Sequence, residues 1–473
     1  MKESQVFVCG NCGYQSPKWL GRCPECGSWN SFSEETVSAA KKGSSSVPTP
    51  NDSEEAKSLS DVVIEPEFRF KTGIEEFDRV IGGGVNKGSS ILLGGEPGIG
   101  KSTLALQVLE KVSATYKVLY ICGEESPAQI KQRALRLKLS TDNIIIYCDT
   151  RLEPIIDTIR KVKPTLIVID SMQTLASADV ISVAGSVNQI RACTLEIIMA
   201  SKQISSAVIL IGHVTKEGLL AGPKVVEHLV DTVLYFDQAS SGVRLVRASK
   251  NRFGSIDEIG IFRMTEKGLV PVKESQGLFI SDRNTENLPA GIAFTAVVEG
   301  SRTFLVEIQA LVVNAKSGYS RVYSDKIENA RVTRIAAVLE RHAGIALSDK
   351  DIYVNVAGGI KLSDVSIELP LALALFSAAS SIPIDSSAVS FGEISLAGEV
   401  RPVGFLEKRA KAASELGFSK AIIPRIKNPG RTLEYVVCQT ISQALSACRM
   451  MSSASSEVSK QDREHNEGSD DRA

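Results

Sequence analysis

The segment with the clearest chemical signal is GEPGIGKS, which runs from Gly95 to Ser102. Its glycines let backbone N–H groups close around phosphate oxygens, its lysine can reach the β- and γ-phosphates, and its serine hydroxyl can bind Mg²⁺. A strand-like run, SSILL, precedes it and a helix-like run, LALQVLEKV, follows, as this chemistry requires. We predict a nucleotide site formed by Gly95, Glu96, Pro97, Gly98, Ile99, Gly100, Lys101, Ser102 and Thr103, with Asp170 joining them from the end of the apolar run TLIVID as the carboxylate behind Mg²⁺.

Hydrolysis of a nucleotide also needs a group that orients or deprotonates the attacking water. Glu124 and Glu125 follow the apolar run VLYICG, which in a parallel sheet ends at the same edge as the glycine-rich segment. A carboxylate there can face the γ-phosphate, although acidic residues also favour helix starts for other reasons. His213 ends a similar run, AVILIGH, and is either a sensor of the γ-phosphate or an ordinary hydrogen-bonded histidine.

A cation is needed to stabilise the phosphoryl group during its transfer. Lys250 and Arg252 lie two residues apart just after the strand-like run GVRLVRAS. On an extended segment that spacing points both side chains the same way. The pair is therefore a candidate for this catalytic charge, with a solvated basic turn as the alternative.

Four cysteines near the start of the chain have the spacing of a metal site. Cys9 and Cys12 form one C-x2-C pair, Cys23 and Cys26 form another, and ten residues separate the pairs. Two thiolate pairs on tight turns provide the tetrahedral ligand set that Zn²⁺ prefers, and four protein ligands leave no open position for catalysis. We predict a structural zinc site at these four cysteines, with two disulfides or free thiols as the alternatives.

Composition limits the classes of protein that the chain can form. With 473 residues, 43% of them hydrophobic, it can bury several large cores, which excludes a small disulfide-stapled module and a wholly disordered chain. The 54 Lys and Arg residues balance 55 Asp and Glu residues, so any basic surface must be local. The longest apolar run, Leu369 to Ile384, contains two prolines and suits a buried helix better than a membrane span. We expect a soluble, cytoplasmic protein with no membrane partner.

Shifts in composition divide the chain into five parts. Residues 1–30 form the cysteine module, 31–60 a flexible polar linker, and 451–473 a disordered polar tail. Between 61 and 273, short apolar runs alternate with amphipathic ones, which predicts an α/β domain with a mostly parallel sheet covered on both faces. Between 274 and 450, strand-like runs cluster before helix-like ones, which predicts an α+β domain.

The order of these segments resembles the bacterial RadA (Sms) family of RecA-like DNA repair ATPases. The resemblance covers about residues 5–450 and includes TGIEEFDRVIGGGV, GGEPGIGKST, YICGEES, LIVIDS, GHVTKEG and KNRFG. The KNRFG segment together with the cysteine module is specific to that family. The resemblance implies ATP, Mg²⁺ and Zn²⁺ as cofactors, Lys101 and Ser102 as ligands of the nucleotide, Asp170 as a Mg²⁺ partner and Glu124 as the water-activating base.

The resemblance further implies a homo-hexameric, helicase-like ring around DNA that promotes branch migration. In such a ring, Lys250 and Arg252 would enter the nucleotide site of the neighbouring subunit. The segments Ser177–Gly185 and Thr215–Lys224 resemble DNA-contacting loops, where Lys216 and Lys224 could touch phosphates, although loop lysines are commonly just solvated. The implied partners are single-stranded DNA, branched recombination intermediates, and a RecA-type recombinase or a replicative helicase.

The region from 274 to 450 resembles the peptidase domain of Lon proteases, which use a Ser–Lys dyad. Ile367 stands at the position of the serine and Glu407 at that of the lysine, so the dyad is missing. Ser366 and Lys408 are one residue away, which on a strand turns a side chain to the other face. We expect a platform for ring formation and DNA binding. A Lon-type protease or unfoldase and a KaiC-like signalling ATPase without affinity for DNA are the alternatives.

Overall fold

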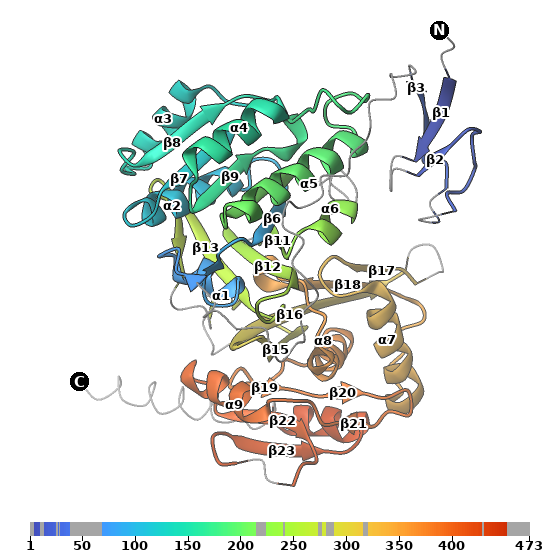
Figure 1. The fold of residues 1–473 in the computed structure, drawn as a ribbon. Helices are drawn as coiled ribbons and strands as arrows, with labels where there is room; N and C mark the ends of the chain where they lie inside the picture. Colours follow the sequence, from blue (N-terminus) through green and yellow to red (C-terminus); the bar gives the residue numbers. More distant parts are fainter. Residues whose placement is uncertain are drawn as a thin grey trace, which may run out of the picture. The chain divides into compact units, whose positions relative to one another are not determined.

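A computed structural model of the chain describes residues 4–9, 14–24, 27, 29–37, 69–213, 224–239, 242–272, 277–280, 288–315, 320–427 and 430–451. They belong to two compact units. The first comprises Met1–Gln238 and Val243–Pro271, and the second comprises Ala239–Gly242 and Val272–Ala473. Figure 1 shows the elements of both units. None of the helices in the described part is long and apolar enough to cross a membrane.

The N-terminal module is a small antiparallel sheet. Its strand order is β2-β1-β3. The strands are β1 (Ser4–Cys9), β2 (Gln15–Ser16) and β3 (Phe32–Val37). Cys9, Cys23 and Phe32 form its buried centre, against which Phe7 and Leu20 pack. Two of the four predicted metal ligands therefore share one small core.

A nine-stranded sheet dominates the first unit, in the order β14-β13-β12-β11-β6-β10-β9-β7-β8. The six strands from β11 to β8 run parallel, and β12, β13 and β14 add to them antiparallel. The strands are β6 (Ser90–Gly95), β7 (Val118–Cys122), β8 (Ile144–Cys148), β9 (Leu166–Asp170), β10 (Ala207–His213), β11 (Thr232–Gln238), β12 (Val243–Asn251), β13 (Ile259–Thr265) and β14 (Gly268–Pro271). A separate two-stranded sheet pairs β4 (Arg69–Phe70) with β5 (Val85–Asn86).

Helices cover both faces of the large sheet. Side chains of α1, α2 and α3 share one core cluster with alternate strand residues such as Ile91 and Leu93, and those of α4, α5 and α6 share the other with residues such as Leu92. The two-sided burial that the apolar runs predicted is thereby confirmed. The helices are α1 (Glu75–Val80), α2 (Lys101–Ser113), α3 (Pro127–Arg136), α4 (Leu152–Val162), α5 (Val187–Gln203), α6 (Lys224–Leu229) and the short 3-10 helix η2 (Met172–Thr174).

The second unit contains a mixed seven-stranded sheet in the order β17-β18-β16-β15-β19-β22-β23. Its strands are β15 (Ile292–Glu299), β16 (Arg302–Asn314), β17 (Val322–Ser324), β18 (Lys350–Val356), β19 (Ala388–Ser390), β22 (Lys420–Pro424) and β23 (Glu434–Cys438). Further elements of this unit are α7 (Asn329–Ala343), η3 (Ala357–Gly359), η4 (Val365–Ile367), α8 (Glu368–Ser380), α9 (Leu406–Glu415), a hairpin of β20 (Glu393–Ile394) and β21 (Val400–Arg401), and a helix over residues 441–451. Helix α8 is buried from Glu368 to Ser377, so the longest apolar run is a core helix, as expected.

Candidate nucleotide site

The loop between β6 and α2 has a backbone that only glycine adopts without strain. Gly98 and Gly100 have φ angles of 77° and 118°, in the region that favours glycine. A Cβ atom on Gly95 would lie 2.8 Å from the carbonyl oxygen of Phe236 on β11, so the neighbouring backbone would have to move. Gly100 directly precedes α2, whose unpaired N-terminal N–H groups attract anions. The loop therefore fits a bound phosphate chain.

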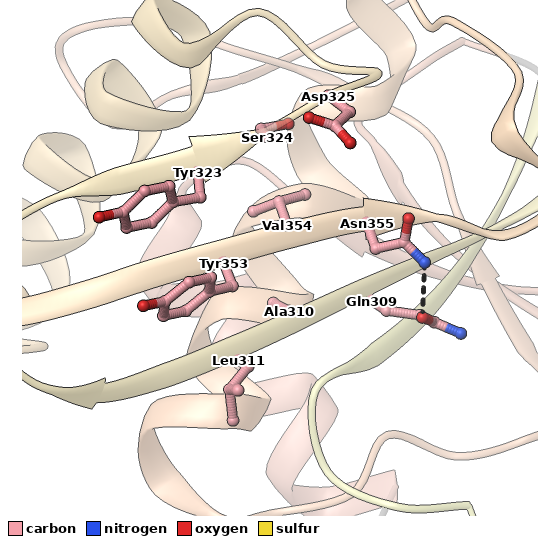
Figure 2. A pocket seen from close by; sticks show the side chains of 9 residues that line it. All are labelled: Gln309, Ala310, Leu311, Tyr323, Ser324, Asp325, Tyr353, Val354 and Asn355. Carbon is pink, nitrogen blue, oxygen red and sulfur yellow. Dashed lines mark hydrogen bonds between the residues drawn. The ribbon is translucent and has the colours of Figure 1, made fainter.

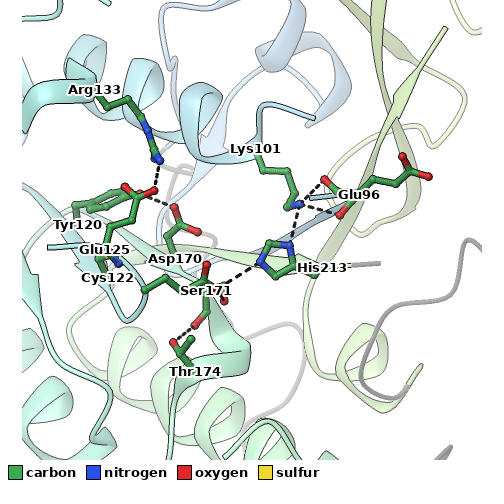
Figure 3. A network of polar contacts seen from close by, with 12 residues as sticks. Glu96, Lys101, Tyr120, Cys122, Glu125, Arg133, Asp170, Ser171, Thr174 and His213 are labelled. Atoms are coloured by element: carbon green, nitrogen blue, oxygen red, sulfur yellow. Dashed lines mark hydrogen bonds and ion pairs between the residues drawn. The ribbon is translucent and has the colours of Figure 1, made fainter. Parts of the chain in front are cut away.

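Lys101 is the first residue of α2, and its side chain is buried. Its Nζ donates to the carbonyl oxygens of Gly95 at 2.7 Å and Glu96 at 2.9 Å, and it lies 3.3 Å from Nδ1 of His213 (Figure 3). Only 4% of the residue is exposed. Burial lowers the pKa of Lys101 to about 8, against the opposing charges of Asp170, Glu124 and Glu96. Burial makes the charged form of Lys101 energetically unfavourable, so the side chain is suited to bind a negatively charged phosphate.

Glu124 and His213 are brought together at the carboxyl edge of the sheet, where the parallel strands end. Nε2 of His213 lies 3.4 Å from Oε1 of Glu124, which also accepts a hydrogen bond from the Ser171 hydroxyl. His213 thus bridges Glu124 and Lys101. Glu125 pairs instead with Arg133 of α3, so the two adjacent carboxylates have different partners.

Asp170, at the end of β9, is held by a partner that the sequence did not reveal. The hydroxyl of Tyr120, a buried residue of β7, donates to Oδ2 of Asp170 at 2.5 Å. Burial raises the pKa of Tyr120 well above its ordinary value, so the phenol stays a donor. Asp170 keeps a second carboxylate oxygen, Oδ1, that could face a Mg²⁺ shell, which fits its predicted role.

The backbone at Gly123 closely approaches a neighbouring segment, a contact that no sequence pattern predicted. A Cβ atom at this position would lie 2.0 Å from Oγ1 of Thr174. The N–H of Gly123 donates to the carbonyl of Asp170 at 3.0 Å, which ties the end of β7 to the end of β9. A glycine directly before two carboxylates was the available signal, because such a glycine often marks a close approach of two chain segments.

The two predicted catalytic cations lie at the opposite end of the sheet from the phosphate loop. Arg252 Nη1 is 3.2 Å from Oδ1 of Asp231, which accepts through Oδ2 from both the N–H and the hydroxyl of Ser90. Lys250 Nζ donates to carbonyl oxygens at the end of α6, at 2.9, 3.3 and 2.6 Å from those of Glu227, His228 and Val230. Both cations therefore gather at one corner of the unit.

Their distance from the phosphate loop of the same chain follows from β6. The strand begins at Ser90, beside this corner, and ends at Gly95, beside the loop. At about 3.3 Å per residue, its five steps span roughly 17 Å. Burial and the neighbouring Arg252 charge lower the pKa of Lys250.

One of the two candidate DNA loops is described. The polypeptide from Ser177 to Ser182 is fixed by Gln189, whose Nε2 donates to three loop carbonyl oxygens, and by Glu153, which accepts from Ser177 and Ala178. Ile181, within this segment, and Val183, directly after it, are exposed. Lys216 lies outside the described residues. Lys224 begins α6.

The cysteine module shows two turns of the kind that zinc ligands occupy. The N–H of Cys9 donates to Tyr14 O at 2.9 Å, and the N–H of Gly27 donates to Cys23 O at 2.9 Å. Both thiols are buried, and Gly27 has a φ of 72°, which suits a tight turn. Cys12 and Cys26 lie outside the described residues. The two described thiols fit a buried metal.

The position of a Lon-type dyad contains a closed ionic network. Ile367 and Ser366 are fully buried, and the Ser366 hydroxyl accepts from Nη1 of Arg409 at 2.8 Å. Nη2 of Arg409 pairs with Asp364 at 2.6 Å. Glu407 is exposed, and Nζ of Lys408 lies over the Phe405 ring, 5.1 Å from its centre. The serine therefore faces a guanidinium, which cannot act as a base.

Family models match three parts of the chain. The model of the KaiC ATPase matches residues 70–146, that of the rubredoxin metal-binding domain residues 7–34, and that of the Mg-chelatase subunit ChlI residues 323–427. A KaiC-like protein of Pyrococcus horikoshii OT3 is a structural match with a TM-score of 0.38 and 20% identity, covering 44% of this chain and all of that one. Fold and site together define a RecA-like P-loop ATPase with an N-terminal zinc ribbon and a ChlI/Lon-like C-terminal region.

Curated relatives match nearly the whole chain. DNA repair protein RadA of Treponema pallidum is 47% identical over 460 residues, covering 95% of this chain and 99% of the relative. The proteins of the same name from Listeria monocytogenes and Bacillus subtilis are 42% and 41% identical, each covering 94% of this chain and 98% of its own length. The chain belongs to the RadA family of DNA repair proteins. The family assignment establishes an ATPase whose cofactors are ATP, Mg²⁺ and Zn²⁺.

Proposed function

We propose that the protein is a DNA-dependent motor that works as a homo-hexameric, helicase-like ring and promotes branch migration of recombination intermediates. The observation that carries this proposal is a separation within one subunit. Lys101, Glu124 and Asp170 gather at the carboxyl edge of the sheet, whereas Lys250 and Arg252 lie at the other end of β6. The two residue groups that we propose as halves of one catalytic site therefore lie too far apart within one subunit to act together.

The carboxyl edge would bind and orient the nucleotide. Lys101 would exchange its carbonyl partners for the β- and γ-phosphates, while Ser102 and Asp170 would hold Mg²⁺, which neutralises phosphate charge when bound. Glu124 would take the proton of the attacking water. His213 and the Ser171 hydroxyl, both in contact with Glu124, would keep that carboxylate in place.

The opposite end would complete the site of a neighbouring subunit. Arg252 is 60% exposed although it pairs with Asp231, so its guanidinium is accessible to a second copy. Because about 17 Å of strand separates it from its own phosphate loop, contact with a neighbour's nucleotide is the simpler arrangement. Hydrolysis would then depend on assembly, since neither half suffices alone.

We propose that this motor acts on DNA. The relatives' name, DNA repair protein, supports it, and single-stranded DNA and branched intermediates are the substrates we propose, with a RecA-type recombinase or replicative helicase as partner. The closed network around Ser366 argues against the protease alternative, because a buried serine held by Arg409 has neither access to a peptide nor a base. A KaiC-like signalling ATPase would lack any response to DNA.

The deciding experiment measures ATP hydrolysis with and without single-stranded DNA, together with the mass of the assembly. We expect stimulation by DNA and a particle of six 50.8 kDa chains. A monomer that hydrolyses ATP at the full rate on DNA contradicts the ring. A rate that DNA leaves unchanged, with no binding at low salt, favours the signalling alternative.

Mixed rings test whether the cations act on a neighbour. Arg252→Ala subunits keep an intact phosphate loop, and Lys101→Ala subunits keep an intact cation pair. Each variant alone should be inactive, and mixing them should restore part of the activity, because some interfaces then combine two intact halves. The double variant mixed with either single variant is the matched control and should restore nothing. Inactive mixtures of the two single variants reject the trans assignment.

A further inference from the structure

Tyrosines in the two units differ in how their hydroxyl groups can find hydrogen-bond partners. Tyr323 of β17 and Tyr353 of β18 stack on a sheet face of the second unit, where they are 44% and 40% exposed (Figure 2). Water can reach both of these residues. Tyr120 of β7 is instead fully buried. Its hydroxyl therefore needs a partner within the protein, because an unpaired polar group in the interior is costly.

The ring of Tyr120 belongs to the apolar core on one face of the large sheet. It shares this core with Leu93 of β6, Leu104 of α2 and Val168 of β9. A phenylalanine ring would fill the same space. The packing of the core therefore explains the ring at this position but not its hydroxyl group.

The hydroxyl of Tyr120 is paired with the carboxylate that we expect behind Mg²⁺. It donates to Oδ2 of Asp170 at 2.5 Å. Tyr120 is in register with Val168 on β9, so Asp170 is its diagonal neighbour on the same face of the sheet. A hydroxyl that donates to a charged carboxylate typically lies about 2.5–2.7 Å from it. The contact is therefore a strong, directed hydrogen bond.

Strand β7 holds Asp170 at two points and leaves its other carboxylate oxygen to the phosphate loop. The N–H of Gly123 donates to the carbonyl oxygen of Asp170 at 3.0 Å, and the Tyr120 hydroxyl holds Oδ2. Within the described part of the chain, no group donates to Oδ1. Burial lowers the pKa of Lys101, and among the nearby carboxylates Asp170 opposes this most. Figure 3 shows Tyr120 and Lys101 on either side of Asp170.

We propose that Tyr120 is a positioning residue for Mg²⁺, which holds Asp170 by Oδ2 so that Oδ1 faces the metal. The proposal rests on the proposed role of Asp170 in holding Mg²⁺, and it depends neither on a ring nor on DNA. Mg²⁺ demands near-ideal coordination geometry, which a carboxylate fixed in one orientation can meet. Loss of a hydrogen-bond partner behind a metal ligand typically costs about 10–100-fold in metal affinity.

A purely structural pairing has different consequences. In that case the Tyr120 hydroxyl and Asp170 would only satisfy each other in the interior. Removal of the hydroxyl would lower the stability of the fold, because Oδ2 would lose its donor. The effect of Mg²⁺ on nucleotide binding would stay as it is in wild type. The two roles are therefore separated by a measurement of metal-dependent binding.

The test compares the affinity of the full-length protein for a fluorescent, non-hydrolysable ATP analogue in excess Mg²⁺ and in EDTA. The ratio of the two affinities reports what the metal contributes. We expect Tyr120→Phe to lower this ratio by about tenfold or more. The affinity in EDTA should not change, because the phosphate loop and Lys101 are untouched, and this also shows that the fold is intact. A wild-type ratio in Tyr120→Phe overturns the proposal.

Tyr235→Phe is the matched control. Tyr235 of β11 also donates to a carboxylate, Oε1 of Glu227, at 2.9 Å. The variant therefore removes the same kind of hydrogen bond from the same unit, at a carboxylate for which we propose no metal. It should keep the wild-type ratio. An equal loss in Tyr235→Phe and Tyr120→Phe overturns the proposal, because the effect would then not be specific to Asp170.

Asp170→Asn tests whether Tyr120 acts through this carboxylate. Asparagine keeps the size of the side chain and removes its charge, so the ratio should fall at least as far as in Tyr120→Phe. The double variant should fall no further than Asp170→Asn alone, because residues that act through one contact are not additive. Additive losses contradict a positioning role for Tyr120.

The same variant separates this proposal from its foundation. If Asp170→Asn keeps the wild-type ratio, the proposed role of Asp170 in holding Mg²⁺ fails, and the role of Tyr120 fails with it. If Asp170→Asn lowers the ratio and Tyr120→Phe does not, only the role of Tyr120 is overturned, and its hydroxyl is a structural partner of Asp170.

Discussion

Each of the two units has a buried charged cluster near the start of a helix, and the clusters differ in how fully their charges are paired. At α2, the buried cation Lys101 donates to two neutral carbonyl groups, and Glu124 is 45% exposed. At η4, Arg409 pairs with Asp364 and donates to three further oxygens, those of Ser366, Gly404 and Ala296. The first cluster leaves charge available to a ligand, and the second does not.

The same contrast holds for the carboxylates. Glu368, the first residue of α8, is 1% exposed and pairs with Arg331 and Arg334 while accepting from the N–H of Ile394. Burial opposes ionisation of Asp364, but the Ser366 N–H and the Arg409 guanidinium keep its pKa below the ordinary value. A buried charge with incomplete partners indicates a binding site, whereas a fully paired one indicates a structural role.

The largest expected effect is at Lys101. Lys101→Ala removes the cation that would meet the γ-phosphate, so ATP hydrolysis should fall by about 100-fold or more. A steady-state phosphate-release assay measures the rate. Because the side chain is buried and its charge is only partly offset, the variant should stay folded, as circular dichroism would show. A folded variant that hydrolyses ATP normally would remove the distinction between the two clusters.

The next effect is on stability and belongs to the second cluster. Arg409→Met leaves Asp364 buried without its partner, which should cost about 3–5 kcal/mol of unfolding free energy. Urea unfolding followed by circular dichroism measures the loss. The matched control is the double variant Arg409→Met with Asp364→Asn, which removes both charges and should recover part of the stability. If Arg409→Met alone is as stable as wild type, the network is not a structural element.

The sequence was sufficient to predict elements that depend on local pattern. Alternating apolar runs predicted the parallel sheet covered on both faces, and the apolar run from Leu369 predicted a buried helix; both are confirmed. The family models confirm the zinc and nucleotide cofactors. The roles of Glu124, Lys250 and Arg252 stay predictions, although the fold determines where each one lies.

Contacts between distant segments could not be predicted. Tyr120 and Asp170 are 50 residues apart and meet only because β7 and β9 are neighbours in the sheet. The pairing of Arg409 with Asp364 likewise depends on a strand order that no periodicity encodes. A single sequence indicates which face of an element is buried, but not which element lies beside it.

A smaller effect is expected from the titration of Lys101. Its pKa is about 8 in the nucleotide-free protein, and bound phosphates should raise it. Above pH 8, Lys101 must therefore take up a proton when ATP binds. In this range ATP affinity should fall by up to about tenfold for each unit of pH, whereas below pH 8 it should not change with pH. Calorimetric titration between pH 7 and 9.5 measures this, with Lys101→Met as the control that should not respond. A flat wild-type profile contradicts the depressed pKa.

The smallest effects are expected at the former dyad positions. Glu407 and Lys408 are exposed at the start of α9, and Nζ of Lys408 lies over the Phe405 ring. Glu407→Ala and Lys408→Ala should therefore each change the unfolding free energy by less than about 0.5 kcal/mol. Neither should alter ATP hydrolysis.

The same two variants also test for residual peptidase chemistry. Wild type and both variants should leave casein uncleaved, because Ser366 is fully buried and its hydroxyl is held by a guanidinium that does not accept protons. The assay needs a Lon-type protease as its positive control. Cleavage by wild type that is lost in Lys408→Ala would mean that the second cluster opens to bind a substrate. In that case the two clusters would differ only in how completely their charges are paired. The completeness of charge pairing in one structure would then not distinguish a binding site from a structural cluster.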